Sequence, residues 1–138
     1  MDEQAFTKMF LQGPTRTLSL GHTEVASWSV GQGPDLLFVH GWPLWAATFR
    51  RLAPFLAPHF RLHFFDLPGA GFSRCADLSK VSVGEHVKTL GAVVKALGLT
   101  DYAILAHDSG GAIARLHAAT HANANVNAMV LSGTEIAS

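Results

Sequence analysis

Short runs of apolar residues recur along the chain, each bounded by residues that favour turns. An unbroken apolar run of this kind is typical of a strand buried on both faces of a parallel sheet. A looser alternation of apolar and polar residues at 15–30 predicts an antiparallel hairpin that turns at Gly21-His22. Residues 36–39 form such an unbroken run, and strands are also expected at residues 60–65, 102–107 and 126–131.

Between these runs, apolar side chains recur every three or four residues, which predicts helices. The helices expected from this spacing are residues 44–56, 83–97 and 110–121. Pro54 is expected to end or kink the first of them. The second has the clearest limits, because Ser82 and Glu85 form a capping-box pattern at its start and Gly98 is a typical helix end.

Strands that alternate with helices predict an α/β fold, a mostly parallel sheet with helices on both faces. Ligands of such sheets bind beyond the carboxyl ends of the strands. The side chains that fall at those ends are His40, Asp66, Asp108 and Glu135. The sequence therefore predicts a site at this edge of the sheet.

Composition narrows the class of ligand. The chain has 138 residues, about half of them hydrophobic, and a formal net charge of zero, so a single domain is expected. Without a basic run or a long apolar segment, neither nucleic acid nor a membrane is an expected partner, and a small neutral organic substrate fits better. The first residues lack the pattern of a signal peptide, so we expect a cytoplasmic protein. One cysteine, Cys75, and scattered histidines predict neither a metal site nor a cofactor.

The most informative stretch is Ala106-His-Asp-Ser-Gly-Gly111, where a predicted strand turns sharply into a predicted helix. Asp108 lies at the apex, with a small residue two places before it and another two places after it. This pattern is typical of a nucleophile elbow, whose apical residue has a strained backbone and an exposed side chain. A plain helix N-cap is the alternative interpretation of Asp108. Ser109 is an alternative nucleophile, although His107 would then occupy a position that requires a small residue.

Three motifs in order resemble the α/β-hydrolase family: His40-Gly-Trp-Pro43, Asp66-Leu-Pro-Gly-Ala-Gly-Phe-Ser73 and the elbow. Aspartate at the apex resembles the branch that contains epoxide hydrolases and haloalkane dehalogenases. The resemblance extends over residues 1–138 as the N-terminal part of the hydrolase core domain. It implies a core that lacks the cap, the last two strands and the late catalytic histidine, and thus a truncated hydrolase.

The resemblance implies a two-step reaction. Asp108 attacks an sp3 carbon and forms an ester, which an activated water then hydrolyses. It implies that the backbone N–H groups of Trp42 and Ser109 stabilise the oxyanion, and that the site is lined by the other motif residues, His40, Gly41, Pro43, His107, Gly110 and Gly111. Glu135 resembles a catalytic acid of some haloalkane dehalogenases, and a surface glutamate is the equal alternative.

Several alternatives stay open. His40 and His107 are candidate substitutes for the missing base, although His40 is rather expected to brace its loop. Asp66 is expected to stabilise a turn. Ser109 replaces the tryptophan that binds halide in many haloalkane dehalogenases, which favours an epoxide hydrolase. A non-catalytic binding or assembly module is the competing class of function. Because residues 126–131 would form an open sheet edge, we expect a second chain or a second copy to cover it.

Overall fold

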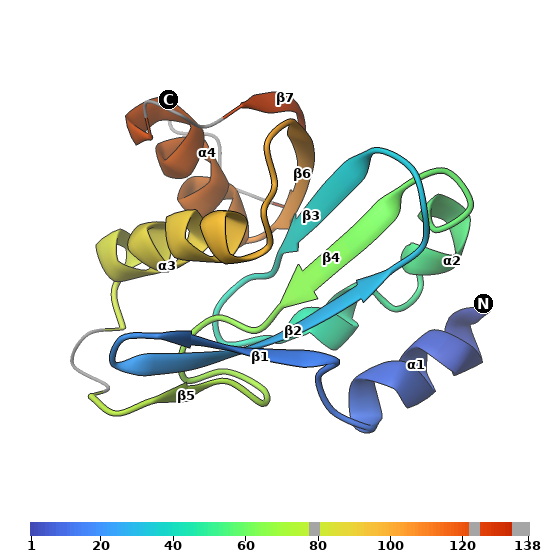
Figure 1. The fold of residues 1–138 in the computed structure, drawn as a ribbon, viewed down its shortest axis with the longest axis horizontal. Helices are drawn as coiled ribbons and strands as arrows, with labels where there is room; N and C mark the ends of the chain where they lie inside the picture. The colour runs from blue at the N-terminus through green and yellow to red at the C-terminus, as the bar shows by residue number, and fades with distance from the viewer. Residues whose placement is uncertain (78–80, 122–124, 134–138) are drawn as a thin grey trace.

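The computed structural model describes residues 1–77, 81–121 and 125–133. In these ranges, seven strands form one sheet with the order β1-β2-β4-β3-β6-β7, and β5 pairs with β2 outside this path (Figure 1). The strands are β1 Arg16–Leu20, β2 Thr23–Val30, β3 Asp35–Val39, β4 Arg61–Phe65, β5 Arg74–Cys75, β6 Tyr102–His107 and β7 Val126–Ser132.

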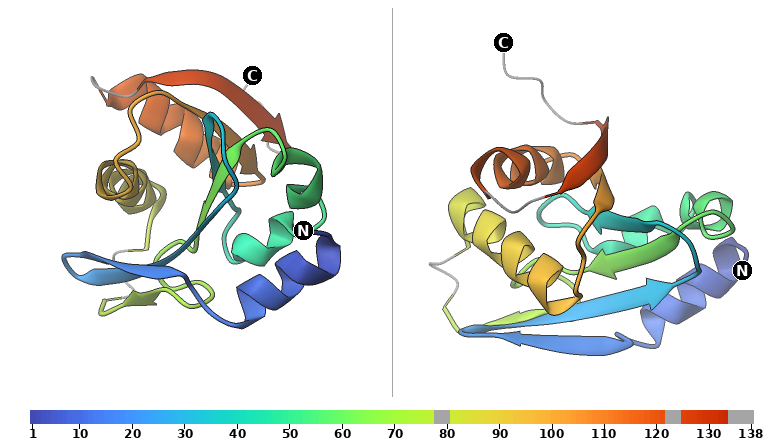
Figure 2. Two further views of the ribbon diagram at one scale, coloured as in Figure 1. Left: turned by 45° about the vertical axis from the view of Figure 1, so that its right-hand side comes forward. Right: turned by 45° about the horizontal axis from the view of Figure 1, so that its top comes forward.

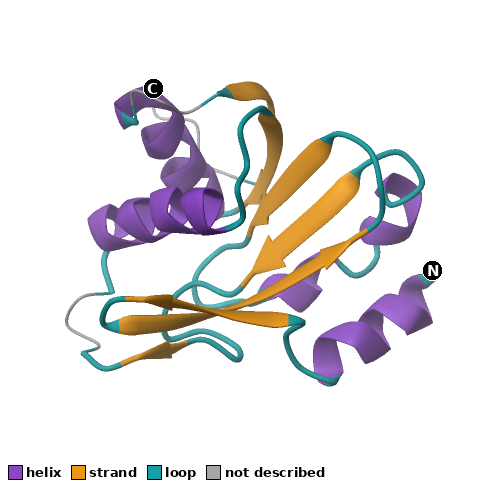
Figure 3. Ribbon diagram, viewed as in Figure 1, coloured by secondary structure: helices purple, strands orange, loops and turns teal. Residues whose placement is uncertain are grey.

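Strand direction divides the sheet into two parts. β4, β3, β6 and β7 run parallel to one another, whereas β2 pairs antiparallel with β1, β4 and β5. Figure 3 shows how the long β1–β2 hairpin extends from one side of this parallel part. The predicted hairpin, the four predicted strands of the parallel part and the α/β fold class are confirmed, and β7 is the one of these four strands that is not buried.

Helices cover both faces of the sheet (Figure 2). α3 (Val83–Ala96) and α4 (Gly110–Thr120) lie on one face, and α1 (Glu3–Leu11), the 3-10 helix η1 (Ala46–Phe49) and α2 (Ala53–Leu56) lie on the other. Side chains alternate between the two faces along a strand, so Ile104 joins the core under α3 and α4 while Leu105 joins the opposite core. β3, β4 and β6 are therefore largely buried on both faces, whereas the residues of β7 at the edge are half-buried or exposed.

The core beside α1 is aromatic. The Phe10 ring meets the rings of Trp28 and Phe64 edge to face, at centroid distances of 5.3 and 5.1 Å. Fully burying one such ring stabilises a fold by about 1.5–3 kcal/mol. α1 was not predicted from the sequence, although Asp2 caps its start by accepting the N–H of Ala5 at 2.8 Å, and Phe6 and Phe10 are spaced as one buried helical face.

The single helix predicted at residues 44–56 is wrong. The chain instead forms η1 and then, after a turn, α2. Pro54 lies in the first turn of α2, where the missing proline N–H has no helical acceptor in any case. The break between the two helices therefore lies before Pro54. The predicted break is confirmed, but Pro54 does not end or kink a helix.

The helix predicted at 83–97 is confirmed as α3. The Ser82 hydroxyl accepts the N–H of Glu85 at 3.2 Å, and Gly98 adopts a left-handed φ of 69° just beyond the helix. None of the helices in the described ranges is long and apolar enough to cross a membrane.

Candidate active site

Asp108 lies at the turn between β6 and α4, at the carboxyl end of the parallel strands, and its side chain is exposed. Its φ of 55° makes it the one residue other than glycine with positive φ in the described part of the chain. This conformation costs an ordinary residue about 1–2 kcal/mol. Hydrogen bonds on both sides hold it: the Asp108 N–H donates to the Ser132 carbonyl at 3.0 Å, and the Gly111 N–H donates to the Asp108 carbonyl at 2.9 Å.

Two glycines allow the chain to pack closely around this turn. A Cβ on Gly110 would lie 2.4 Å from the Val39 carbonyl oxygen and 2.6 Å from that of His40. A Cβ on Gly41 would lie 2.7 Å from the Asp108 Cβ. All three distances are too short for any side chain, so glycine at these two positions allows the loop after β3 to lie against the elbow.

Ser109 joins this loop to the elbow. Its hydroxyl accepts the backbone N–H of Trp42 at 2.8 Å, across 67 residues of sequence. Although Ser109 is the N-cap of α4, its side chain makes no capping hydrogen bond. The two residues predicted to supply oxyanion donors are thus brought together, and the Trp42 N–H already has an acceptor.

His40 is buried, and both of its ring nitrogens are engaged. Nε2 accepts the N–H of Leu67 at 2.8 Å, so Nδ1 carries the proton and donates to the Gly41 carbonyl at 2.8 Å. Burial lowers the pKa of His40 to about 4. A neutral ring with both nitrogens occupied matches the expected bracing of the loop.

Asp66 is also buried, and it connects two loops. One carboxyl oxygen accepts the N–H of Ala46 and the other that of Phe72, both at 2.8 Å. Burial raises the pKa of Asp66 to about 6, partly offset by these two donors. The predicted turn-stabilising contacts are present.

Two other predicted site residues, His107 and Pro43, border separate pockets. The half-buried His107 lines a small cavity of about 180 Å³ with Thr48, Phe49 and Leu52, on the face covered by η1 and α2. Pro43 follows a cis peptide bond and borders a shallow pocket with Trp45, Gly71 and Phe72. Glu135 lies outside the described residues. His107 is therefore not brought to the apex of the elbow.

His86 was not predicted as a site residue, although it packs against Trp42. Its ring lies 5.5 Å from the Trp42 ring, centroid to centroid, and burial lowers its pKa. Among the described residues its buried Nδ1 has no hydrogen-bond partner. The only sequence signal is a histidine in the first turns of a helix, next to the buried Val87, and this is too common to identify a site.

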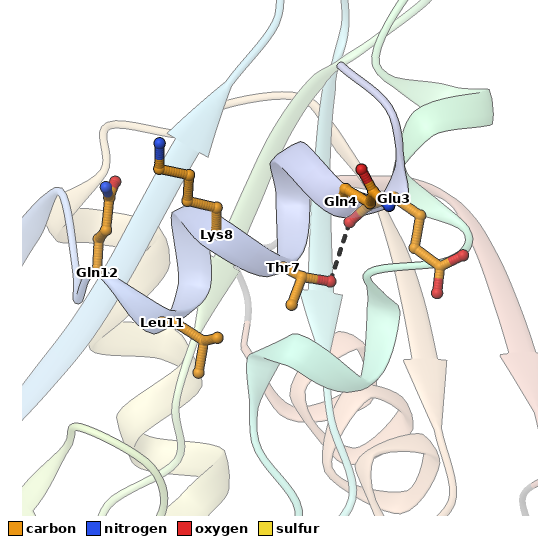
Figure 4. Close-up of a pocket in the computed structure, with 6 residues that line it drawn as sticks. All are labelled: Glu3, Gln4, Thr7, Lys8, Leu11 and Gln12. Carbon is orange, nitrogen blue, oxygen red and sulfur yellow. Dashed lines mark hydrogen bonds between the residues drawn. The ribbon is translucent and has the colours of Figure 1, made fainter.

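Another pocket lies away from the elbow. It is a depression of about 690 Å³ on the outer surface of α1 (Figure 4). Its lining residues all come from this one helix, and Figure 4 shows Lys8, Leu11 and Gln12 side by side along it. One helix face cannot enclose a ligand, so we assign it no function. In the described ranges, no group of three or more His, Cys, Asp or Glu side chains could hold a metal ion.

We expect the protein to lose stability below pH 6.5. Burial lowers the pKa of His40 and of His117 to about 4, the latter with a further contribution from His121. The unfolded chain then binds more protons, so this stability is complete above pH 6.5 and is lost as the pH falls toward 4. The raised pKa of Asp66 has the opposite effect, because it stabilises the folded protein as the pH falls, but it is one group against two histidines. The urea midpoint should be lower at pH 5 than at pH 7, and an equal or higher midpoint at pH 5 would contradict this assignment.

Comparison with known proteins identifies the family of the chain. Residues 34–138 match the family model of the alpha/beta hydrolase fold, so the chain belongs to this family. It is 35% identical over 101 residues to a pimeloyl-[acyl-carrier protein] methyl ester esterase from Xanthomonas campestris pv. campestris, a match that covers 73% of this chain and 38% of that protein.

Solved structures give the same family. An alpha/beta hydrolase fold protein from Burkholderia ambifaria superimposes with a TM-score of 0.81 and 31% identity, over 90% of this chain and 45% of that one. A candidate epoxide hydrolase from Pseudomonas aeruginosa has a TM-score of 0.75 and 27% identity, over 86% and 40%. An inferred ancestral haloalkane dehalogenase has a TM-score of 0.79 and 28% identity, over 86% and 42%. The chain thus spans less than half the length of these relatives.

Proposed function

We propose that the chain belongs to a hydrolase of the epoxide hydrolase type and that Asp108 is its nucleophile. A carboxylate oxygen of Asp108 attacks one epoxide carbon, the C–O bond of the ring breaks, and the released alkoxide takes a proton from solvent. The product is an alkyl ester on Asp108. The observation that carries this proposal is the exposed carboxylate held at positive φ at the end of β6.

The first step suits this residue type. A free aspartate side chain is ionised at neutral pH, so it needs no base before it attacks. The close approach of Gly41 leaves the loop after β3 against the Asp108 carboxylate, which a larger residue would displace. The N-terminus of α4, which starts at Gly110, presents its positive end to the same region.

The second step needs an activated water and donors for a tetrahedral oxyanion. We propose the backbone N–H groups of Ser109 and Trp42 as these donors, the latter after the Ser109 hydroxyl has moved from it. His40 is a poor base, because both of its ring nitrogens are engaged. Glu135 remains our candidate for the carboxylate that orients a histidine. Hydrolysis of the ester by these 138 residues alone is therefore expected to be slow.

Two other candidate reactions have specific support. Similarity to a haloalkane dehalogenase favours displacement of halide by the same aspartate, although Ser109 offers only a short hydroxyl at the next position. The methyl ester esterase relatives favour hydrolysis of an ester, and Ser109 is the alternative nucleophile for such a reaction. Ser109 is the serine nearest the apex, but its backbone is helical, with φ of −62°, and its hydroxyl binds Trp42. Both features favour Asp108 as the nucleophile.

The test is to incubate the chain with styrene oxide, with 1-bromohexane and with a fluorophosphonate in parallel. Epoxide opening adds the whole reagent mass, whereas halide displacement adds the alkyl group without bromine. We expect the epoxide adduct, mapped to the peptide that contains Asp108. A bromohexane adduct there, with no epoxide adduct, would favour the dehalogenase, and a phosphonate on Ser109 would favour the esterase.

We also propose that a second chain or a second copy covers the outer edge of β7. β7 ends the strand order, and Val130 on it is 57% exposed. An apolar edge strand is a template for pairing with another strand. The 138-residue chain is expected to sediment as a dimer or larger species at micromolar concentration. A monomer that is soluble and unfolds cooperatively would reject this proposal.

A further inference from the structure

A second group of polar side chains forms a continuous hydrogen-bonded chain across three strands. The Ser29 hydroxyl on β2 lies 2.8 Å from Nδ1 of His63 on β4, and Nε2 of His63 lies 2.7 Å from a carboxyl oxygen of Asp35 on β3. We call Ser29, His63 and Asp35 the polar relay. Ser29 and His63 are direct partners in the β2–β4 register, which explains why their side chains meet.

Chemistry fixes the direction of both hydrogen bonds. An ionised carboxylate only accepts, so Nε2 of His63 carries a proton and donates it to Asp35. Nδ1 of the neutral ring then has a lone pair, and it accepts the Ser29 hydroxyl proton. Burial lowers the pKa of His63, with Asp35 acting in the opposite direction and Arg61 adding to the decrease, so the ring is neutral at pH 7. This is the arrangement in which a histidine withdraws a proton from a serine.

The polar relay lies away from the elbow. Asp35 begins β3, whereas the elbow lies at the carboxyl end of the same parallel strands, about 15 Å away for five residues of strand. The His63 side chain is 2% exposed and that of Asp35 is 31% exposed, while Ser29 is half-buried. The base is thus shielded from water, whereas Ser29 is only partly buried.

We propose that Ser29 is a second nucleophile of this protein, activated by His63 and Asp35, and that it accepts acyl or phosphonyl groups from small activated esters. In the step, the Ser29 oxygen forms a bond to the acyl carbon or to phosphorus while its proton passes to Nδ1 of His63. The bond to the leaving phenolate or fluoride breaks, and that group departs with the bonding electrons. The product is an ester on Ser29, and it forms independently of Asp108.

The experiment measures labelling of the full 138-residue chain by a small fluorophosphonate at pH 7.5, with the modified residue located by peptide mass spectrometry. We expect label on Ser29 and none on Ser19, a more exposed serine on β1 that serves as an internal control for accessibility. The Asp108→Ala variant should be labelled at the same rate. Labelling of Ser29 is therefore expected even if Asp108 proves not to be the nucleophile for epoxides.

Three variants test the relay itself. Ser29→Ala should lose the label, and His63→Gln should label about a hundredfold more slowly, the usual effect of losing a general base. Asp35→Asn should label at least about tenfold more slowly, and it preserves the shape of the carboxylate if the His63 variant unfolds. The proposal is overturned if Ser29 is unlabelled in the wild-type protein, if Ser19 labels as fast, or if Asp35→Asn labels at the wild-type rate while its thermal unfolding is unchanged.

Discussion

Replacing Asp108 with alanine is expected to abolish the adduct that styrene oxide forms with the chain. Alanine has no carboxylate, so the rate of ester formation should fall to background, by about a hundredfold or more. Intact-mass spectrometry of wild type and variant under the same conditions measures the effect. An adduct that survives the substitution would show that another side chain is the nucleophile.

The matched control is Asp108→Gly. Both variants lose the carboxylate, but glycine adopts the φ of 55° at Asp108 freely whereas alanine does not. The glycine variant should therefore have a free energy of unfolding about 1 kcal/mol higher than the alanine variant, as measured by urea denaturation. Equal loss of adduct in two variants of different stability would separate the chemistry from folding.

Gly110→Ala is expected to be the most destabilising single change at the site. The new Cβ would lie 2.4 and 2.6 Å from two backbone oxygens, of Val39 and His40, and a backbone cannot move aside as a flexible side chain can. Such overpacking costs about 3 kcal/mol. For a domain of this size the unfolding midpoint should fall by roughly 10 °C in a thermal melt followed by circular dichroism.

Gly84→Ala provides the control for this change. Gly84 lies exposed in the first turn of α3, and the nearest atom to its Cβ would be the Ser82 hydroxyl oxygen at 3.9 Å. Alanine favours the helix, so stability should rise by up to about 1 kcal/mol. If Gly110→Ala were as harmless as Gly84→Ala, the close packing of α4 against the loop after β3 would be wrong.

Much of the fold was predictable because the sequence pattern of these segments matches their burial and position in the folded protein. The strand at 102–107 is apolar because it is buried on both faces, and α3 carries its own capping box. The single helix predicted at residues 44–56 is wrong, because apolar spacing alone does not show that the chain turns between η1 and α2. α1 was not predicted, because the first residues were considered only for the pattern of a signal peptide.

The position of the candidate site was predictable from the ends of the strands, but its contacts were not. No sequence spacing indicates that the Ser109 hydroxyl binds the N–H of Trp42, or that His86 packs on the Trp42 ring. The polar relay was equally hidden, because Ser29, His63 and Asp35 come from three strands. Such contacts depend on strand order and register, which a single sequence does not specify.

The hydrogen bond between Ser109 and Trp42 has a consequence for the timing of the proposed reaction. Alkylation of Asp108 develops no oxyanion on its carboxyl carbon, so it proceeds with the serine hydroxyl in place. Hydrolysis of the ester does develop one, and the oxyanion must first displace that hydroxyl, a contact worth about 0.5–1.5 kcal/mol. In the proposed reaction, the serine that holds the Trp42 N–H is therefore expected to prolong the lifetime of the covalent intermediate.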